Sequence, residues 1–242
     1  ENDDTKMTLS TPYGTFGVFI SEGGLDVEDA ASQSVYSRPT DTGDPSATVD
    51  NFTIDSYNNV QYHTPADLLP FSTSFKIAYA TDLQDVSPGS SGNNAGADGT
   101  KSVTYAGESA TEMQLKTSPI DGLTLGASYM NFDGEGQQTN DQDAESGAYY
   151  ATYATGPISV GYSKAYRANL LGGQASTATG GARASGAVEY YDQSNYSVAY
   201  AVNDDFSISY EVEKSERVGV DTATATVEQK STGLQLAYNL GG

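Results

Sequence analysis

Residues 71–79 read Phe-Ser-Thr-Ser-Phe-Lys-Ile-Ala-Tyr, and the character of the side chains alternates along this stretch. The odd-numbered positions are Phe71, Thr73, Phe75, Ile77 and Tyr79, and the even-numbered positions are Ser72, Ser74, Lys76 and Ala78. Because successive side chains of a β-strand point to opposite faces of a sheet, the stretch predicts a strand with one apolar and one polar face. Such a strand suits a wall that separates lipid from water.

The same alternation recurs along the chain and predicts about eleven strands. We expect them at residues 5–10, 13–20, 57–64, 71–81, 102–117, 123–132, 147–154, 158–167, 186–202, 206–217 and 222–240. Tight turns, such as Pro119-Ile120-Asp121-Gly122, join them on one side, and long loops rich in Gly, Asn and Asp join them on the other. This sorting is typical of outer-membrane barrels, whereas a β-sandwich need not sort its loops in this way.

The composition favours a thin apolar band over a large buried core. Only 37% of the 242 residues are hydrophobic, and the chain has 18 Tyr against 7 Phe and no Trp. Tyr suits a membrane interface because its ring lies among acyl chains while its hydroxyl reaches the headgroups, although Tyr also favours strands in general. We therefore expect one all-β domain over residues 1–242, an antiparallel transmembrane β-barrel with a polar lumen.

Charge and cysteine content exclude several classes of function. The formal net charge is -21 at pH 7, so nucleic acid is not an expected partner. The chain has no cysteine, which excludes disulfides, thiol nucleophiles and thiolate metal sites. His63 is the only histidine and the chain has no Gly-x-Ser-x-Gly motif, so we expect no enzyme activity.

Three short segments flank or follow a long acidic stretch at residues 21–51. Residues 13–18 read Tyr-Gly-Thr-Phe-Gly-Val, residues 58–65 read Asn-Asn-Val-Gln-Tyr-His-Thr-Pro, and residues 74–79 read Ser-Phe-Lys-Ile-Ala-Tyr. In their order and spacing they resemble the strand that enters the inward-folded third loop of Gram-negative general porins, the strand that leaves it, and that strand's hairpin partner. The chain is thus similar to the trimeric diffusion channels of the outer membrane.

The resemblance implies a location, a function and partners. It implies a channel of the bacterial outer membrane for passive diffusion of small hydrophilic solutes and ions, working as a homotrimer among outer-membrane lipid and lipopolysaccharide. General porins typically have sixteen strands and often end in an aromatic residue, whereas this chain ends Asn239-Leu240-Gly241-Gly242. Because bacterial barrels have an even number of strands, we expect further strands beyond both ends of the given chain.

By the same resemblance, residues 21–51 form a constriction loop that folds into the barrel. Its acidic residues are Glu22, Asp26, Glu28, Asp29, Asp41, Asp44 and Asp50, and Asp55 lies just beyond. Acids that face wall cations across an opening set a field that selects solutes by charge. The alternative is a solvated acidic loop outside the pore.

Odd and even positions of a strand point to opposite faces, and this side-chain parity predicts which charged strand residues face the lumen. A Lys on the lipid face near mid-bilayer costs about 2 to 4 kcal/mol, so charges opposite the apolar register should face water. The expected lumen residues are the cations Lys6, Lys76, Lys116 and Arg167 and the acids Glu112, Glu211 and Glu213. Lys164 shares the parity of Tyr162 and is expected at the interface, where its stem can snorkel, or at a subunit contact. His63 is expected in the lumen or at its rim.

Two alternatives stay open at the level of sequence. Residues 140–145 have an acid at every second position, and Asp141, Asp143 and Glu145 could bind Ca²⁺. The segment lacks the glycine and the distal Glu of an EF-hand loop. No other cofactor is expected. Acidic loops and alternating strands also fit a secreted calcium-binding β-sandwich adhesin. The other alternative is a substrate-specific outer-membrane channel, which saturable flux would distinguish from a general porin.

Overall fold

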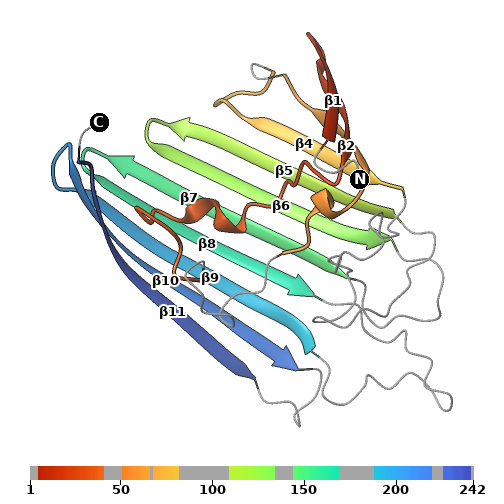
Figure 1. Cartoon of the computed structure of the whole chain (residues 1–242). Coiled ribbons are helices and arrows are strands. Elements are labelled where there is room, and N and C mark those ends of the chain that lie inside the picture. The colour runs from red at the N-terminus through yellow and green to blue at the C-terminus, as the bar shows by residue number, and fades with distance from the viewer. Residues whose placement is uncertain are drawn as a thin grey trace.

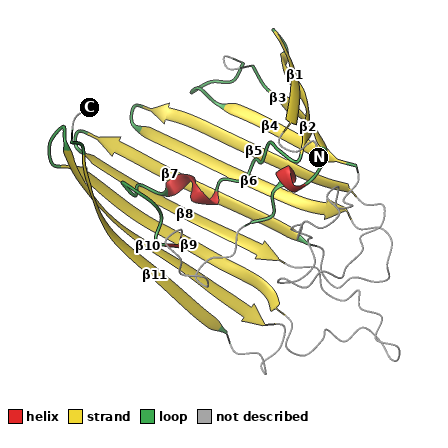
Figure 2. Ribbon diagram, in the orientation of Figure 1, coloured by secondary structure: helices red, strands yellow, loops and turns green. Residues whose placement is uncertain are grey.

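The computed structural model describes residues 5–40, 51–65, 68–81, 109–133, 144–168, 188–219 and 226–240 (Figure 1). The strands are β1 (Thr5–Thr11), β2 (Gly14–Ile20), β3 (Asn59–His63), β4 (Ser74–Ala80), β5 (Ser109–Ile120), β6 (Leu123–Asp133), β7 (Glu145–Thr155), β8 (Ile158–Ala168), β9 (Val188–Ala201), β10 (Phe206–Gly219) and β11 (Val227–Tyr238). Two short 3₁₀ helices, η1 (Glu28–Ala31) and η3 (Ile54–Ser56), also lie in these ranges (Figure 2). None of the described helices is long and apolar enough to cross a membrane.

All eleven strands form one antiparallel sheet, in which each strand pairs with its neighbour in sequence. The sheet curves around a hollow face, and β1 and β2 stand steeply against the other strands (Figure 1). Within the described ranges β1 and β11 are its two edges, so the sheet does not close. The predicted all-β antiparallel architecture with eleven strands is confirmed. The sandwich alternative is wrong for this part of the chain, because its strands do not divide into two stacked sheets.

The outward face of the sheet is mostly apolar and is uncovered. Leu234 and Leu236 on β11 are 68% and 61% exposed, and Met7 and Leu9 on β1 are 74% and 66% exposed. The alternate residues on each strand point to the hollow face, as the parity of a pleated sheet requires. An exposed apolar band of this kind is what a lipid-facing barrel wall needs.

The sequence pattern misplaced several strand boundaries, and two of them have a clear physical reason. Strand β4 begins at Ser74 rather than at residue 71, because Phe71 and Ser72 have φ angles of 59° and 51° and turn the chain. At the other boundary, β5 runs on through Ile120, and the turn into β6 narrows to two residues. Gly122 occupies that turn with a φ of 77°, where a Cβ would lie 2.2 Å from a backbone oxygen of β7.

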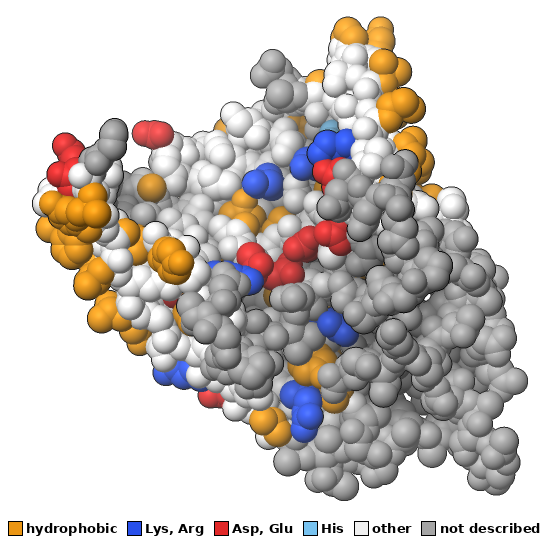
Figure 3. All heavy atoms as spheres, viewed as in Figure 1, with side chains coloured by type: hydrophobic (Ala, Val, Ile, Leu, Met, Phe, Trp, Pro, Cys, Tyr) orange, Lys and Arg blue, Asp and Glu red, His pale blue; other side chains and the backbone are white. Residues whose placement is uncertain are grey.

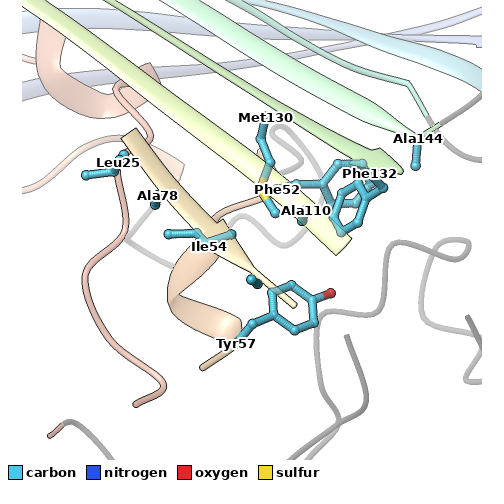
Figure 4. Packing of buried hydrophobic residues seen from close by; sticks show 10 residues of the cluster. Leu25, Phe52, Ile54, Tyr57, Ala78, Ala110, Met130, Phe132 and Ala144 are labelled. Atoms are coloured by element: carbon cyan, nitrogen blue, oxygen red, sulfur yellow. The ribbon is translucent and has the colours of Figure 1, made fainter. Parts of the chain in front are cut away.

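An apolar cluster covers part of the hollow face (Figure 4). Its members are Leu25, Phe52, Ile54, Tyr57, Ala78, Ala80, Ala110, Met130, Phe132 and Ala144. The rings of Phe52 and Phe132 meet edge to face with their centroids 5.1 Å apart. The expected polar lumen is therefore wrong for this part of the hollow face, because apolar residues between β2 and β3 in sequence are buried against inward-facing residues of the wall.

Candidate pore constriction

Residues 21–40, called here the inner loop, cross the hollow face from β3 towards β11 (Figure 1). Near its start, Gln61 Nε2 on β3 donates to the backbone oxygen of Gly23 over 2.6 Å. Further along, Ser163 Oγ on β8 donates to the backbone oxygen of Glu28 over 2.9 Å. The inner loop is thus attached to the wall at several points along its length, and its backbone polar groups find partners there.

The carboxylate of Glu112 on β5 holds two backbone groups at once. Its Oε2 accepts hydrogen bonds from Leu25 N over 3.3 Å and from Ile54 N over 2.8 Å. The side chain of Glu112 is 1% exposed. Beside it, Gln114 Nε2 donates to the backbone oxygen of Leu25 over 2.8 Å. Glu112 therefore ties both the inner loop and the η3 segment to the same strand.

Two more carboxylates, both on β10, hold the far part of the inner loop. Glu211 accepts hydrogen bonds from the hydroxyls of Ser32 and Ser34, the first over 2.7 Å. Glu213 Oε2 accepts from both the backbone N and the Oγ1 of Thr40, over 3.0 and 2.8 Å. The three glutamates expected to line open lumen thus lie on the hollow face but beneath the inner loop, which they anchor.

Near its middle, the inner loop lies directly against the strands of the wall. A Cβ built on Gly161 of β8 would lie 1.7 Å from the backbone oxygen of Ala31. Ser197 Oγ on β9 donates to this same oxygen over 2.7 Å and accepts from Gln33 N over 3.1 Å. Only glycine at position 161 leaves room for this approach.

The acids of the inner loop do not share one environment. Glu22 Oε1 lies 2.5 Å from Lys6 Nζ of β1, and Asp29 pairs with Arg38 of the loop itself. Asp26 and Asp55 lie close together, since a Cβ on Gly24 would be 3.0 Å from a carboxylate oxygen of each. Sequence reasoning missed Arg38, because an isolated arginine in an acidic stretch carries no periodic signal.

Glu28 is an acid of the inner loop whose ionisation depends on docking. Burial raises the pKa of Glu28 from 4.5 to about 8, and the charge of Asp26 adds to the shift, while the backbone N–H groups of Glu28 and Asn51 oppose it. A cavity of about 20 Å³ beside Glu28 and Arg38 has room for one water molecule. The docked loop therefore favours the neutral form of Glu28.

This shift predicts that docking of the inner loop weakens as pH rises. Between the ordinary pKa of 4.5 and the docked value of about 8, the docked loop keeps a proton that a detached loop would release. We expect wild-type single-channel recordings to show more frequent transitions to a larger conductance as pH rises from about 5 to 9. Glu28→Gln should weaken this dependence, and Glu22→Gln should keep it in full. Equal pH dependence in the Glu28→Gln variant would contradict the assignment.

The four expected lumen cations all lie on the hollow face. Lys6 contacts Glu22, and Lys76 lies opposite Gln114, whose side chain binds the inner loop. Lys116 shares the parity of Gln114, and the guanidinium carbon of Arg167 lies 4.4 Å from the centroid of the Phe52 ring. Figure 3 shows basic side chains gathered beside β1, β2 and β4, and a strip of acidic side chains across the middle of the same face.

His63 is half-buried on this face, opposite Lys76 across the β3–β4 pair. Its Nε2 lies 2.8 Å from Gln61 Oε1. Lys164 has the opposite parity to the expected lumen cations of the strands. It lies on the outward face and pairs with Asp192 over 2.8 Å. Sequence reasoning did not foresee Asp192 as its partner, because the register of β8 against β9 brings the two together.

Several expected site residues lie outside the described residues, namely Asp41, Asp44 and Asp50 of the loop and Asp141 and Asp143 of the calcium candidate. Glu145, the third member of that candidate, accepts a hydrogen bond from the hydroxyl of Tyr129. In the part of the chain that the structure describes, no three His, Cys, Asp or Glu side chains form a group that could hold a metal ion.

Comparison with known proteins shows a likeness in fold alone. No family model matches the chain. No curated protein sequence matches it either. Among solved structures, it is similar to a porin refined at 1.8 Å resolution, with 18% identity over 98% of this chain and 71% of the porin and a TM-score of 0.57.

Two further similar structures come from one outer-membrane protein. One is outer-membrane expressed OmpT of Vibrio cholerae, which is 13% identical and has a TM-score of 0.53. The match covers 96% of this chain and 63% of the OmpT chain. The other is a loop L8 deletion mutant of the same protein, which is 16% identical and has a TM-score of 0.51. The match covers 98% of this chain and 68% of the mutant chain. The chain spans about two thirds of the length of these proteins and has the fold of outer-membrane β-barrels.

Proposed function

We propose that the chain is part of an outer-membrane porin, a water-filled channel through which small hydrophilic solutes and ions diffuse passively. The observation that carries this proposal is the inner loop, which lies across the hollow face of an outer-membrane-type barrel wall and is bonded to β3, β5, β8, β9, β10 and β11. A loop fixed in this way would narrow the passage. Neither a cofactor nor covalent chemistry is needed, and we propose no enzyme activity.

The charges on the hollow face support selection of solutes as well as sieving. Lys6, Lys76 and Lys116 lie on the wall beside one end of the inner loop, while Asp26 and Asp55 belong to the segments that cross the face. Opposed charges on two sides of an opening create a transverse field. A solute that passes must align its own charges or dipole with that field, so size and charge are tested at the same place.

The surroundings of the channel follow from the same proposal. The apolar outward face would contact outer-membrane lipid, including lipopolysaccharide, and neighbouring subunits of a homotrimer in a Gram-negative bacterium. Calcium at the loops of residues 140–145 stays a proposal that rests on sequence alone. No observation on the described residues favours a saturable binding site, so the substrate-specific channel remains the second candidate.

Conductance measurements test the proposal. We expect the full-length protein, purified in detergent, to insert into planar lipid bilayers and give stepwise current increments that rise linearly with salt concentration. Flux of a small neutral sugar into liposomes should likewise rise linearly with sugar concentration. Saturating flux of one solute would favour the substrate-specific channel, and a protein that is monodisperse without detergent and gives no current would contradict the proposal.

A further inference from the structure

The outward face carries charge on one part of the sheet only. Among the described side chains, the outward positions of β1 to β6 hold no Lys, Arg, Asp or Glu, and those of β7 hold Glu145, which bonds to the hydroxyl of Tyr129. On β8 to β11 six charged residues point outward, called here the outer charged patch: Lys164, Asp192, Lys214, Glu216, Glu228 and Lys230. Since a charge on the lipid face is costly near mid-bilayer and nearly free at the interface, this concentration needs a physical reason.

The register of β10 against β11 places like charges directly opposite each other. Lys214 lies opposite Lys230, and two residues further on Glu216 lies opposite Glu228. Directly opposite like charges destabilise an antiparallel pair. Ion pairs between diagonal neighbours would offset this cost, yet none of these four side chains forms an ion pair within 4.0 Å among the described residues. Lys164 and Asp192, by contrast, lie 2.8 Å apart.

The lysines belong to a row of cations and hydroxyls. Across β8 to β11 the register aligns Lys164, Ser194, Lys214 and Lys230 in that order. With strands about 4.8 Å apart, Lys214 and Lys230 present two ammonium groups to the same small space. A phosphate placed there would accept hydrogen bonds from both lysines and turn their repulsion into attraction.

The depth of this row matches a headgroup region. The next outward positions towards the tight turns hold Tyr162, Tyr196, Val212 and Thr232 on β8 to β11 in that order. The ring centroids of the two tyrosines are 5.1 Å apart, and beyond Val212 and Thr232 the side chains of Tyr210 and Leu234 are exposed. Aromatic rings of this kind mark the border between acyl chains and headgroups. The lysine row thus lies just outside an apolar band, on the side of the long loops.

We propose that Lys214 and Lys230 bind a phosphate group of an anionic lipid, in the leaflet on the long-loop side, while its acyl chains lie against the band below. The inference rests on the proposed function, because the wall must span a membrane. The pair Glu216 and Glu228 lies on the loop side of the lysines and repels phosphate, which confines the phosphate to the lysine row. A free phosphate ion would gain nothing from the apolar band, so the lipid is the favoured source.

Native mass spectrometry of the full-length protein with added lipids, in EDTA, tests the proposal. The probes are phosphatidic acid, phosphatidylcholine and inorganic phosphate. We expect the double variant Lys214→Gln/Lys230→Gln to bind phosphatidic acid about tenfold more weakly, with phosphatidylcholine binding unchanged. The matched control Lys76→Gln/Lys116→Gln removes the same charge from the hollow face and should bind phosphatidic acid as the wild type does.

Unchanged phosphatidic acid binding in the outer double variant would overturn the proposal. Competition by millimolar inorganic phosphate as strong as that by the lipid would overturn the lipid as its source. Circular dichroism of each variant checks that the sheet is retained. The single-channel conductance of the outer variant separates the two proposals. Lysine-dependent lipid binding without any conductance would contradict the channel function and still support the lipid site.

Discussion

Glu112→Leu is expected to detach the inner loop from β5 and enlarge the channel. The change removes the acceptor for Leu25 N and Ile54 N, which are both buried. Each buried N–H left without a partner costs about 1 to 3 kcal/mol. That sum is comparable to the roughly 1.5 to 3 kcal/mol gained by burying a side chain such as that of Leu25, so docking of this part of the loop becomes unfavourable.

Single-channel recordings and sugar permeation measure this effect. We expect the Glu112→Leu variant to show larger and noisier current steps and to admit sugars that the wild type excludes. Glu112→Gln is the matched control, because its amide oxygen can still accept both hydrogen bonds, and its conductance should stay near that of the wild type. Identical conductance and size limit in the Leu variant would show that Glu112 does not hold a constriction.

Removing Lys6, Lys76 and Lys116 together by substitution with Gln is expected to shift ion selectivity towards cations. Three positive charges then leave the wall, while the acids of the inner loop remain. Three unit charges about 8 Å from a passing ion in water contribute roughly 0.5 kcal/mol each by Coulomb's law. Their removal corresponds to about a tenfold gain in the permeability of a monovalent cation at low salt and about a tenfold loss for an anion, so the permeability ratio of the two changes by roughly the product. Screening reduces the effect at physiological ionic strength.

Reversal potentials in a salt gradient measure this shift, and the outward face supplies a matched control. The variant Lys164→Gln/Lys214→Gln/Lys230→Gln loses the same number of charges from the opposite face and should keep the wild-type reversal potential. If the two triple variants shift it equally, the side-chain parity on which the channel rests is wrong. If neither does, the cations of the hollow face do not act on permeating ions.

The alternation of side chains was sufficient to predict most of the sheet. The predicted number of strands and their antiparallel hairpin order agree with the structure. The sorting of short turns and long loops agrees in most places, but ten residues join β3 to β4, more than the seven that join β10 to β11. The pattern predicted too early a strand start at Phe71 and Ser72, whose positive φ values place them in a turn. Three residues of alternation do not distinguish a strand end from a turn.

The inner face was harder to predict because a covering segment changed its chemistry. Glu112, Glu211 and Glu213 have the parity of lumen residues, yet the inner loop lies over them and uses them as acceptors. Met130 and Phe132 also face inward, where they pack with the segment that follows the loop. No periodicity in the loop indicates these partners.

The sequence by itself determined which face of each strand is apolar, because side-chain parity follows from the local geometry of an extended backbone. Only the tertiary structure decided where the acidic segment lies and which carboxylates it covers, because these depend on contacts between distant residues. Leu25 and Glu112 are 87 positions apart, and Tyr36 and Gln235 are 199 apart. Such contacts exist only once the sheet has curved, since its curvature brings distant strands around one hollow face.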